Sequence, residues 1–405
     1  MIRGSRKSDT IECTFTEAHF LPIRENRGNH THTRPHHHCH EAGSDRVYLL
    51  EGLDDEDVDA LSLQSGHTRL VIPFHLKRED SVVHIKDPFT LKVRNDHQDR
   101  RELGRTGQFK VLVILVTDRF GNRPSQSESK MANDVFQDRV NLSERFRVCS
   151  KDKLTFSPAT GARVTNGVIT VQTSSSLRGV SYGNCGNLAL RALPSGISRS
   201  YTMFVCPDVA NFGGGSAWGQ LPGSLTWYLS KYASNADVQV HELGHNLGFG
   251  HSGTNLSDRT YDDGTCHMSN EGGFRDESRK FCFNAAKFFH SNWFPEYHSI
   301  VTPTSGNFKG DLVGIDDVVT NRANSGNQEL VVKIQGSRQA DIFMMFNRRK
   351  GINSEVSEHG DRVVIVSQSS RSATSVRIAT LSAGRTHTIN NWANSGNALK
   401  IKVCR

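Results

Sequence analysis

The 405-residue sequence lacks a long apolar run, because its longest, VLVILV from Val111 to Val116, is far too short to cross a bilayer. A run of this length and composition instead predicts a fully buried β-strand. The first residues, MIRGSRKSDTIEC, are basic with no apolar stretch behind them, so no signal peptide is visible. We therefore expect no membrane span, and either a processed or truncated chain or a protein that is not exported by that route.

Charge of one sign is not concentrated anywhere along the chain. The 49 basic and 42 acidic residues are mixed along its length, and the net charge of +7 is not gathered into blocks. A nucleic-acid-binding protein more often carries one concentrated basic face. The charge pattern therefore argues against nucleic acid as a partner.

None of the eight cysteines forms a CxxC pair, which argues against a cysteine-ligated zinc site and a thioredoxin-like motif. Their even number and wide spacing favour four disulfides in an exported protein, and buried free thiols in a cytosolic enzyme are the alternative. Sequons at Asn29, Asn141 and Asn255 point toward an exported glycoprotein as well. We therefore expect a secreted, disulfide-bonded protein.

Composition divides the chain into three regions and a linker. Residues 1–93 contain short alternating runs that predict a small β-rich domain. Residues 94–107 are polar, lack periodicity and include Arg100–Arg101, which is typical of a linker. Residues 108–302 mix strand and helix patterns and predict an α/β domain with a mixed sheet. Residues 303–405 contain short strands between Gly, Asn and Ser clusters, which predict a β-sandwich.

Within the middle region, strands are expected at FKVLVILVTD, GVITVQT and YTMFVC, and a helix in SESKMANDVFQDRVNLSERF. A second helix is expected to lead into the stretch HELGHNLGFGH. Ser234 or Asn235 can cap its start, and its apolar face consists of Val240, Leu243 and Leu247. This helix carries the most informative residues of the chain.

The stretch HELGHNLGFGH contains three histidines and one glutamate. His241 and His245 lie one helical turn apart, so both rings can reach one metal ion. Gly248 permits the left-handed turn that ends the helix and returns His251 as a third ligand. Glu242 is placed to hold a water on that ion rather than to bind the ion. Three protein ligands leave a fourth position open, as in catalytic zinc sites.

The complete pattern HExxHxxGxxH resembles the metzincin metallopeptidase signature, which implies a methionine-containing turn downstream. Met268, in YDDGTCHMSN, fits that role. The chain also resembles the gametolysin (autolysin) family over nearly its whole length. The resemblance is carried by FKVLVILVTD with NDVFQDRVNLSERFRVCSKDKLTFSP, by HELGHNLGFGHSG with YDDGTCHM, and by DIFMMFNRRKGIN. Some family members carry Gln at the position of His241, so the ligand set of this chain is complete.

The resemblance implies a metzincin-like zinc metalloendopeptidase with one catalytic Zn²⁺ held by the three histidines. Glu242 would take a proton from the zinc-bound water and pass it to the departing amine. Extracellular-matrix or cell-wall (glyco)proteins are the implied substrates, we expect a monomer, and a Ca²⁺ requirement stays open. The alternatives are an inactive extracellular matrix or binding protein, against which the intact motif argues, and a zinc hydrolase acting on a non-peptide amide.

Two departures from the family pattern leave part of the site open. Ser269 stands where members commonly have Gly after the methionine, and no tyrosine follows Met268 at the spacing some metzincins use. Tyr261 and His267 are therefore the candidates for stabilising the transition state.

The glycine-rich stretch NFGGGSAWGQ precedes the zinc-site helix, where metzincins have the edge strand that pairs with an extended substrate. Ala217, Trp218 and Gly219 are the candidate residues of that edge strand. A mobile glycine loop is the alternative.

The tract HTHTRPHHHCH in the first region predicts a solvated His-rich loop. Cys39 within it is expected to pair in a disulfide with Cys13, and an inhibitory thiolate on the catalytic zinc is the alternative. Because the linker around Arg100–Arg101 should be exposed to proteases, we expect residues 1–93 to act as an inhibitory or folding prodomain of a zymogen.

Overall fold

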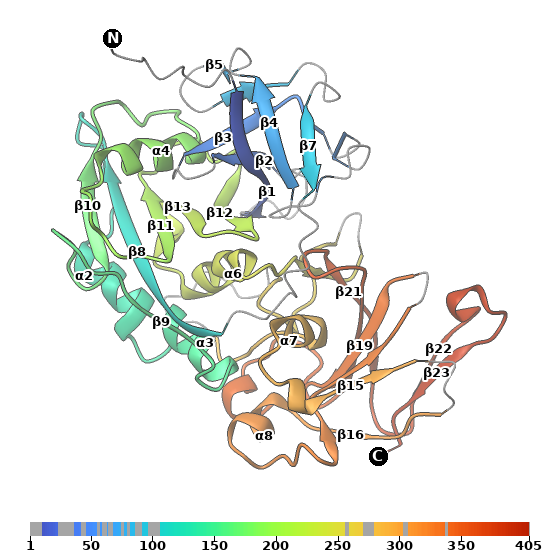
Figure 1. Ribbon diagram of the computed structural model, residues 1–405. Coiled ribbons are helices and arrows are strands. Elements are labelled where there is room, and N and C mark those ends of the chain that lie inside the picture. The colour runs from blue at the N-terminus through green and yellow to red at the C-terminus, as the bar shows by residue number, and fades with distance from the viewer. Residues whose placement is uncertain are drawn as a thin grey trace, which may run out of the picture.

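The computed structural model (Figure 1) contains one large sheet, a second sheet of six strands, and helices between them. This arrangement confirms the mixed α/β class. None of the helices among the described residues is long and apolar enough to cross a membrane. The described residues are 10–22, 36–41, 46–54, 57–58, 63, 68–73, 77–78, 82–85, 91–95, 106–255, 259–269, 279–302, 307–336 and 339–404.

The large sheet has 13 strands, and its first half belongs to the middle region of the chain. Its strands are β8 (Gly107–Thr117), β9 (Leu154–Pro158), β10 (Val168–Gln172), β11 (Tyr201–Cys206), β12 (Gly215–Leu221) and β13 (Leu225–Leu229). All of them run parallel to their neighbours except β12, which is antiparallel to β13. The strands predicted at VLVILV, GVITVQT and YTMFVC are confirmed.

Both faces of β8 are buried, which explains why its sequence is continuously apolar. Alternate side chains, such as Val113 and Ile114, belong to separate hydrophobic cores on the two faces of the sheet. One face is covered by α4 (Tyr182–Ala192), and the other by α2 (Glu128–Ala132), η3 (Asn133–Gln137), α3 (Leu142–Cys149) and α6 (Ala236–Asn246) (Figure 1). The predicted helix after β8 is therefore split into α2, η3 and α3.

The second half of the large sheet comes from the N-terminal region. Its strands are β1 (Thr10–Pro22), β2 (His36–Glu41), β3 (Val47–Glu51), β4 (Thr68–Pro73), β5 (Lys77–Arg78), β6 (Val82–His84) and β7 (Lys92–Asn95). They enclose a hydrophobic core of their own. The long strand β1 joins the two halves, because it pairs with β2 and β4 and also with β12. The predicted linker residues Arg100–Arg101 lie outside the described residues.

The prediction of a solvated His-rich loop is wrong for the part of the tract that is described. His36 to His40 form strand β2, which is paired on both sides, with β1 and β3. His37 and His38 are buried, and the His36 ring stacks on Trp218 at 4.4 Å between centroids. Residues 36–40 are held in this strand by pairing and aromatic stacking with segments that are distant in the sequence. Local composition does not predict such contacts.

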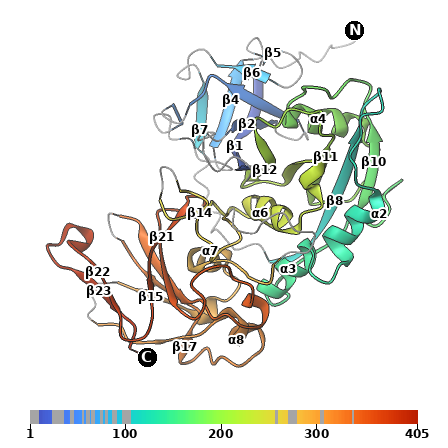
Figure 2. The same ribbon diagram turned by 180° about the vertical axis from the view of Figure 1, so that it is seen from behind.

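The six-stranded sheet is formed mainly by the C-terminal region, and Figure 2 shows it from behind. Its order is β14 (Ser252–Gly253), β21 (Ser375–Leu381), β20 (Val363–Gln368), β19 (Asp341–Phe346), β18 (Val331–Ile334) and β15 (His298–Val301). One face packs on α7 (Ala285–Ser291), and the other shares a core with the hairpin β22 (Thr386–Ile389) and β23 (Leu399–Lys402). The domain boundaries and the β-sandwich stay predictions.

The remaining elements of the described residues are short. They are α5 (Ser230–Ala233), α8 (Ile315–Val319), β16 (Asp311–Leu312), β17 (Gln328–Glu329), η4 (Pro295–Tyr297), η6 (Gly351–Asn353) and η7 (Trp392–Asn394).

Three disulfides are present, and the expectation of four is wrong. They join Cys13 to Cys39, Cys149 to Cys282, and Cys185 to Cys206. Cys266 is buried and Cys404 is exposed, so these two thiols stay apart and free. The expected pairing of Cys39 with Cys13 is confirmed, which removes Cys39 as an inhibitory thiolate.

The sequon at Asn141 does not suit glycosylation in this fold. Asn141 is buried and caps α3, where its Oδ1 accepts a hydrogen bond from the Glu144 amide at 2.7 Å. Its side-chain nitrogen, the atom that would carry a glycan, is directed to the Asp138 carbonyl at 2.7 Å in this buried position. Asn255 is exposed, and Asn29 lies outside the described residues.

Candidate metal centre

The helix that carries the HExxH residues begins and ends where the sequence predicts. Asn235 is its N-cap and accepts hydrogen bonds from the amides of Asp237 and Val238 at 3.0 and 3.1 Å. The helix α6 ends at Asn246 with Leu247 as its C-cap, and the next residue, Gly248, has a φ of +90°. This left-handed turn brings His251 back toward the helix.

The structure brings the three predicted histidines together. One ring nitrogen from each of His241, His245 and His251 lies within 4.8 Å of the others. The Nδ1 atoms of His241 and His245 contact the backbone carbonyls of His267 and Phe249 at 3.0 and 2.8 Å. The three Nε2 atoms are buried and have no hydrogen-bond partner among the described residues.

These three unpartnered Nε2 atoms show whether a metal ion fits the site. A buried polar atom without a partner is costly, and a carbonyl on Nδ1 fixes the tautomer that presents Nε2 as a ligand. Burial lowers the pKa of His241 to about 4 and holds the pKa values of His245 and His251 well below their usual range. The rings are therefore neutral near pH 7, as metal ligation requires, and the triad could bind a metal ion.

Glu242 lies between two of the histidines on the buried helix. Both of its carboxylate oxygens are buried, and neither has a hydrogen-bond partner within the part of the chain that is described. Burial raises the pKa of this carboxyl well above its usual range. A carboxylate with a raised pKa and no competing partner is suited to accept a proton.

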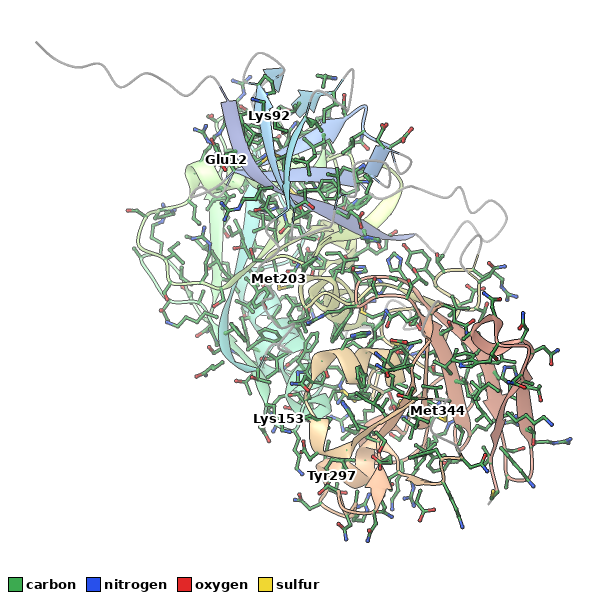
Figure 3. The ribbon with its side chains drawn as sticks, turned by 45° about the vertical axis from the view of Figure 1, so that its right-hand side comes forward. Glu12, Lys92, Lys153, Met203, Tyr297 and Met344 are labelled. Atoms are coloured by element: carbon green, nitrogen blue, oxygen red, sulfur yellow. A yellow bond between two sulfur atoms is a disulfide. The ribbon has the colours of Figure 1, made fainter. Side chains whose placement is uncertain are left out.

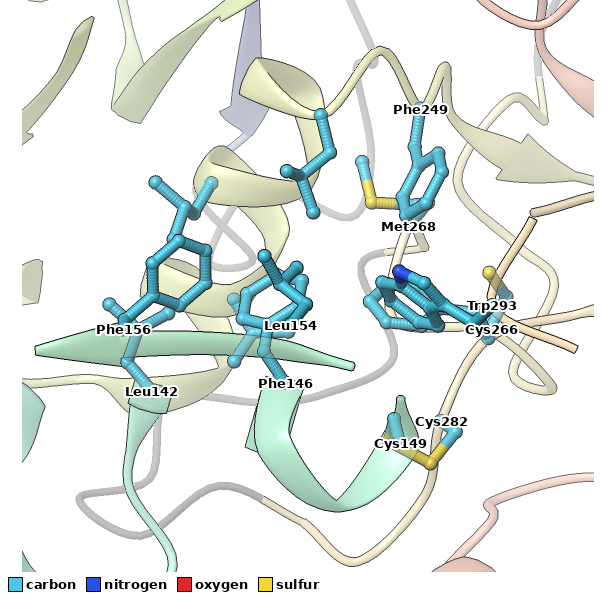
Figure 4. Close-up of a cluster of buried hydrophobic side chains, with 14 of the residues drawn as sticks. Leu142, Phe146, Cys149, Leu154, Phe156, Phe249, Cys266, Met268, Cys282 and Trp293 are labelled. Atoms are coloured by element: carbon cyan, nitrogen blue, oxygen red, sulfur yellow. A yellow bond between two sulfur atoms is a disulfide. The ribbon is translucent and has the colours of Figure 1, made fainter. Parts of the chain in front are cut away.

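Met268 lies against the helix below the histidines. An added Cβ on Gly244 would come within 2.5 Å of the Met268 Sδ, so the turn around Met268 packs directly on the helix backbone. Figure 4 shows Met268 beside Phe249 in the buried cluster, with the disulfide of Cys149 and Cys282 nearby. The Met268 carbonyl also accepts a hydrogen bond from the Ser252 amide at 2.8 Å, just after His251.

The two candidates for stabilising the transition state differ in position. The ring of Tyr261 lies 4.1 Å from that of His251 between centroids, at the histidine cluster. The His267 ring contacts the Phe281 carbonyl through Nε2 at 2.9 Å and lies 3.8 Å from Asp237 through Nδ1. The Nε2 of His267 is thus engaged by the Phe281 carbonyl and its Nδ1 faces Asp237, and Tyr261 is the better placed of the two.

Strand β12 crosses directly over the helix. A Cβ added to Gly219 would meet the Glu242 carbonyl oxygen at 2.5 Å and its Oε2 at 2.9 Å, so only glycine permits this approach. Ala217 and Trp218 lie on the same strand and are fully buried. Residues 215–221 of the glycine-rich stretch thus form a strand over the site, and this strand lies between β13 and β1 rather than at an edge of the sheet.

Residues that the sequence did not single out also hold the site. Ser375, on β21, donates a backbone hydrogen bond to the His251 carbonyl at 2.9 Å. Arg371 donates from Nη2 to the Leu247 carbonyl at 2.6 Å, at the end of the helix. Both come from the C-terminal region, and no motif in the sequence marks either of them.

His19 is a further residue that sequence analysis missed. It lies on β1, and its ring is 5.3 Å from the ring of His245 and 4.9 Å from that of His251. The three metal-site histidines are 4.8 to 5.6 Å apart by the same measure. Only the period-two pattern of a strand surrounds His19, so no signal in the sequence connects it to the site.

Comparison with known proteins places this geometry in a family. No curated protein and no solved structure matches the chain. The family model of the gametolysin peptidase M11 matches residues 110–315, just over half of the chain. The matched segment contains the helix α6, the three histidines and Met268. The protein is therefore a member of the gametolysin peptidase M11 family, and a metallopeptidase.

Proposed function

We propose that the protein is a secreted zinc-dependent endopeptidase that hydrolyses peptide bonds in extracellular or cell-wall (glyco)proteins. The observation that carries this proposal is the group of three buried, unpartnered Nε2 atoms next to the unpartnered carboxylate of Glu242. Three neutral imidazoles with a neighbouring carboxylate form the donor set of a catalytic zinc site with one open position.

In this proposal His241, His245 and His251 hold Zn²⁺ through Nε2. The carbonyls of His267 and Phe249 keep the first two rings oriented. When bound, the metal supplies a Lewis acid that polarises the scissile carbonyl and acidifies a water molecule. Met268 packs beneath the helix and keeps its ligand face rigid.

Glu242 is assigned the proton transfers. Its carboxylate accepts a proton from the attacking water, whose oxygen forms a bond to the carbonyl carbon. The same carboxyl then donates that proton to the peptide nitrogen as the C–N bond breaks, which leaves a carboxylate and an amine as products. Burial raises the pKa of Glu242, which makes its carboxylate a stronger proton acceptor than an exposed one.

The peptide substrate is assigned to the side of β12 that faces away from β13, which β1 occupies in the full chain. An extended peptide can add to such a strand through main-chain hydrogen bonds, with little demand on side-chain identity. Gly219 brings this strand within contact of Glu242, so a peptide on β12 would lie beside the base. Secretion is supported by the three disulfides, which persist in oxidising compartments.

A peptide library, incubated with the purified protein with and without a chelator, tests this function. We expect cleavage within the peptides that stops on chelation and returns when Zn²⁺ is added, because the histidines alone supply no nucleophile. The protein should be assayed both intact and after cleavage in the linker. Cleavage that is insensitive to chelation, or hydrolysis of small amides without any peptide cleavage, contradicts the proposal.

Tyr261 is expected to contribute to the transition state. Its ring lies beside His251, where its hydroxyl can approach the oxygen that becomes negatively charged. Tyr261→Phe should lower kcat by about tenfold, since a hydrogen bond to a charged group contributes about 1.5 kcal/mol. KM and zinc content should stay unchanged. A Tyr232→Phe variant is the control, because it removes a tyrosine hydroxyl from α5, the helix that precedes α6. Equal kcat values for the two variants would show that Tyr261 has no part in the mechanism.

A further inference from the structure

The strand assigned to the substrate is already paired in the full chain. Strand β1 lies antiparallel to β12, on the edge opposite β13, and the two lie side by side in Figures 1 and 2. The register places Glu17 opposite Leu221, His19 opposite Gly219, and Leu21 opposite Ala217. The N-terminal region therefore occupies the main-chain hydrogen-bonding positions that a peptide substrate would need.

The register also determines which β1 side chains face the metal site. Directly opposed residues of an antiparallel pair place their side chains on the same face of the sheet. The Cβ position of Gly219 points at Glu242 and at the Cβ of His245, which lies 3.1 Å away. His19 therefore points toward the metal site, in agreement with its ring distances to His245 and His251.

The hydrogen bonding of His19 matches that of a metal ligand. Its Nε2 lies 3.4 Å from Glu17 Oε2, and the two side chains are 16% and 24% exposed. A ligating histidine commonly donates one ring N–H to a carboxylate, which orients the ring and leaves its other nitrogen for the metal. Here Glu17 would be that carboxylate, and the Nδ1 of His19 would be the ligand atom.

Other contacts fix the N-terminal region on the catalytic part of the chain. The rings of His36, Trp218 of β12 and Tyr182 of α4 form one cluster, in which the His36 centroid lies 4.4 Å from Trp218 and 5.6 Å from Tyr182. Asn187 of α4 donates to the Val47 carbonyl of β3 at 2.8 Å. These contacts are specific and partly buried, so β1 is positioned by more than its own pairing with β12.

We propose that the segment Thr10–Pro22 is an intramolecular inhibitor of the peptidase, and that His19 closes the metal site as a fourth protein ligand. The inference rests on the proposed function, since it names the regulation of the same site. His19 is not in the group of nitrogens that lie within 4.8 Å of one another, so ligation by His19 would require its ring to move toward the ion. A metal with four protein ligands has no position for water, which is the state of a structural site.

Metal binding by the intact protein tests the role of His19. We compare the full chain with His19→Ala, and with Glu12→Ala as a matched control, because Glu12 is an exposed residue of the same strand (Figure 3). His19→Ala should weaken zinc affinity about tenfold or more, because even the loss of a residue that only hydrogen-bonds a metal ligand typically weakens metal affinity by about tenfold. Glu12→Ala should bind zinc like the parent.

Cobalt substitution provides a readout that does not depend on hydrolysis. Co²⁺ bound by four imidazoles has no open position, so acetohydroxamate should leave the visible spectrum of the intact parent unchanged. The same addition should shift the spectrum of His19→Ala. A hydroxamate-induced shift in the intact parent overturns the fourth-ligand assignment, and this result does not depend on how the variant folds. Identical zinc affinities for the parent and His19→Ala overturn it as well.

The inhibitory role is tested by cutting the chain. A recognition sequence for a site-specific protease is placed within residues 96–105, and peptide hydrolysis is compared before and after the cut, with removal of the N-terminal fragment. We expect hydrolysis to rise at least about tenfold, which is about 1.4 kcal/mol in the apparent barrier. Equal hydrolysis by intact and cut protein overturns the inhibitor while the proposed function stands. Bound zinc without hydrolysis in either form is instead the failure of the proposed function.

Discussion

Glu242→Gln should lower peptide hydrolysis by roughly a hundred- to ten-thousand-fold and leave zinc content near one ion per chain. The amide keeps the size of the side chain but cannot accept the proton of the attacking water. Glu242 is assigned to the water, so the histidine nitrogens that hold the metal are untouched. Metal analysis together with a peptide-cleavage assay measures both effects on one preparation.

His245→Ala is the matched comparison, because it removes a ligand from the same helix. Its zinc content should fall together with its activity, and excess zinc should restore part of both. Parent-like hydrolysis by the glutamine variant would show that Glu242 is not the base. Loss of zinc from that variant would show that Glu242 belongs to the ligand set.

Gly219→Ala should lower hydrolysis about a hundred-fold without removing any chemical group from the site. The new Cβ would meet the Glu242 carbonyl oxygen at 2.5 Å, so β12 and the helix must move apart. A displacement of about 1 Å between a substrate strand and a catalytic group costs on the order of a hundred-fold in rate. The strain should also destabilise the fold by about 1–3 kcal/mol, measurable by urea denaturation.

Gly183→Ala provides the control for this variant. Gly183 lies in α4, and an added Cβ there meets nothing within 4 Å. The replacement should leave hydrolysis unchanged and stabilise the fold slightly, since alanine favours the helix by about 1 kcal/mol over glycine. Similar rates for Gly219→Ala and the parent would mean that β12 does not position the substrate against Glu242.

Local sequence was sufficient to predict the strand β8 and the start and end of α6. The buried strand follows from a continuous apolar run, and the ends of the helix follow from the cap at Asn235 and the left-handed Gly248. The clustering of the histidines follows from their spacing and this turn. These features depend on residues within about one or two helical turns of one another.

Contacts between distant segments could not be predicted in this way. The pairing of β1 with β12 joins residues that are far apart in the sequence, and alternation along a strand does not identify its partner. His19 is therefore an ordinary strand histidine in the sequence and a neighbour of the metal site in the fold. The burial of His38 in β2, within a tract expected to be a solvated loop, has the same cause.

The pairing of β14 with β21 has a consequence for how the chain can be divided. Two residues directly after His251 form an edge strand of the C-terminal sheet, and β21 lies beyond residue 315, where the family match ends. A chimaera that joins the matched segment to an unrelated C-terminal region would leave Ser252 and Gly253 without this strand. It would also leave the His251 carbonyl without the Ser375 amide. A segment that keeps the contacts of residues 251–253 therefore has to include β21, which ends at Leu381.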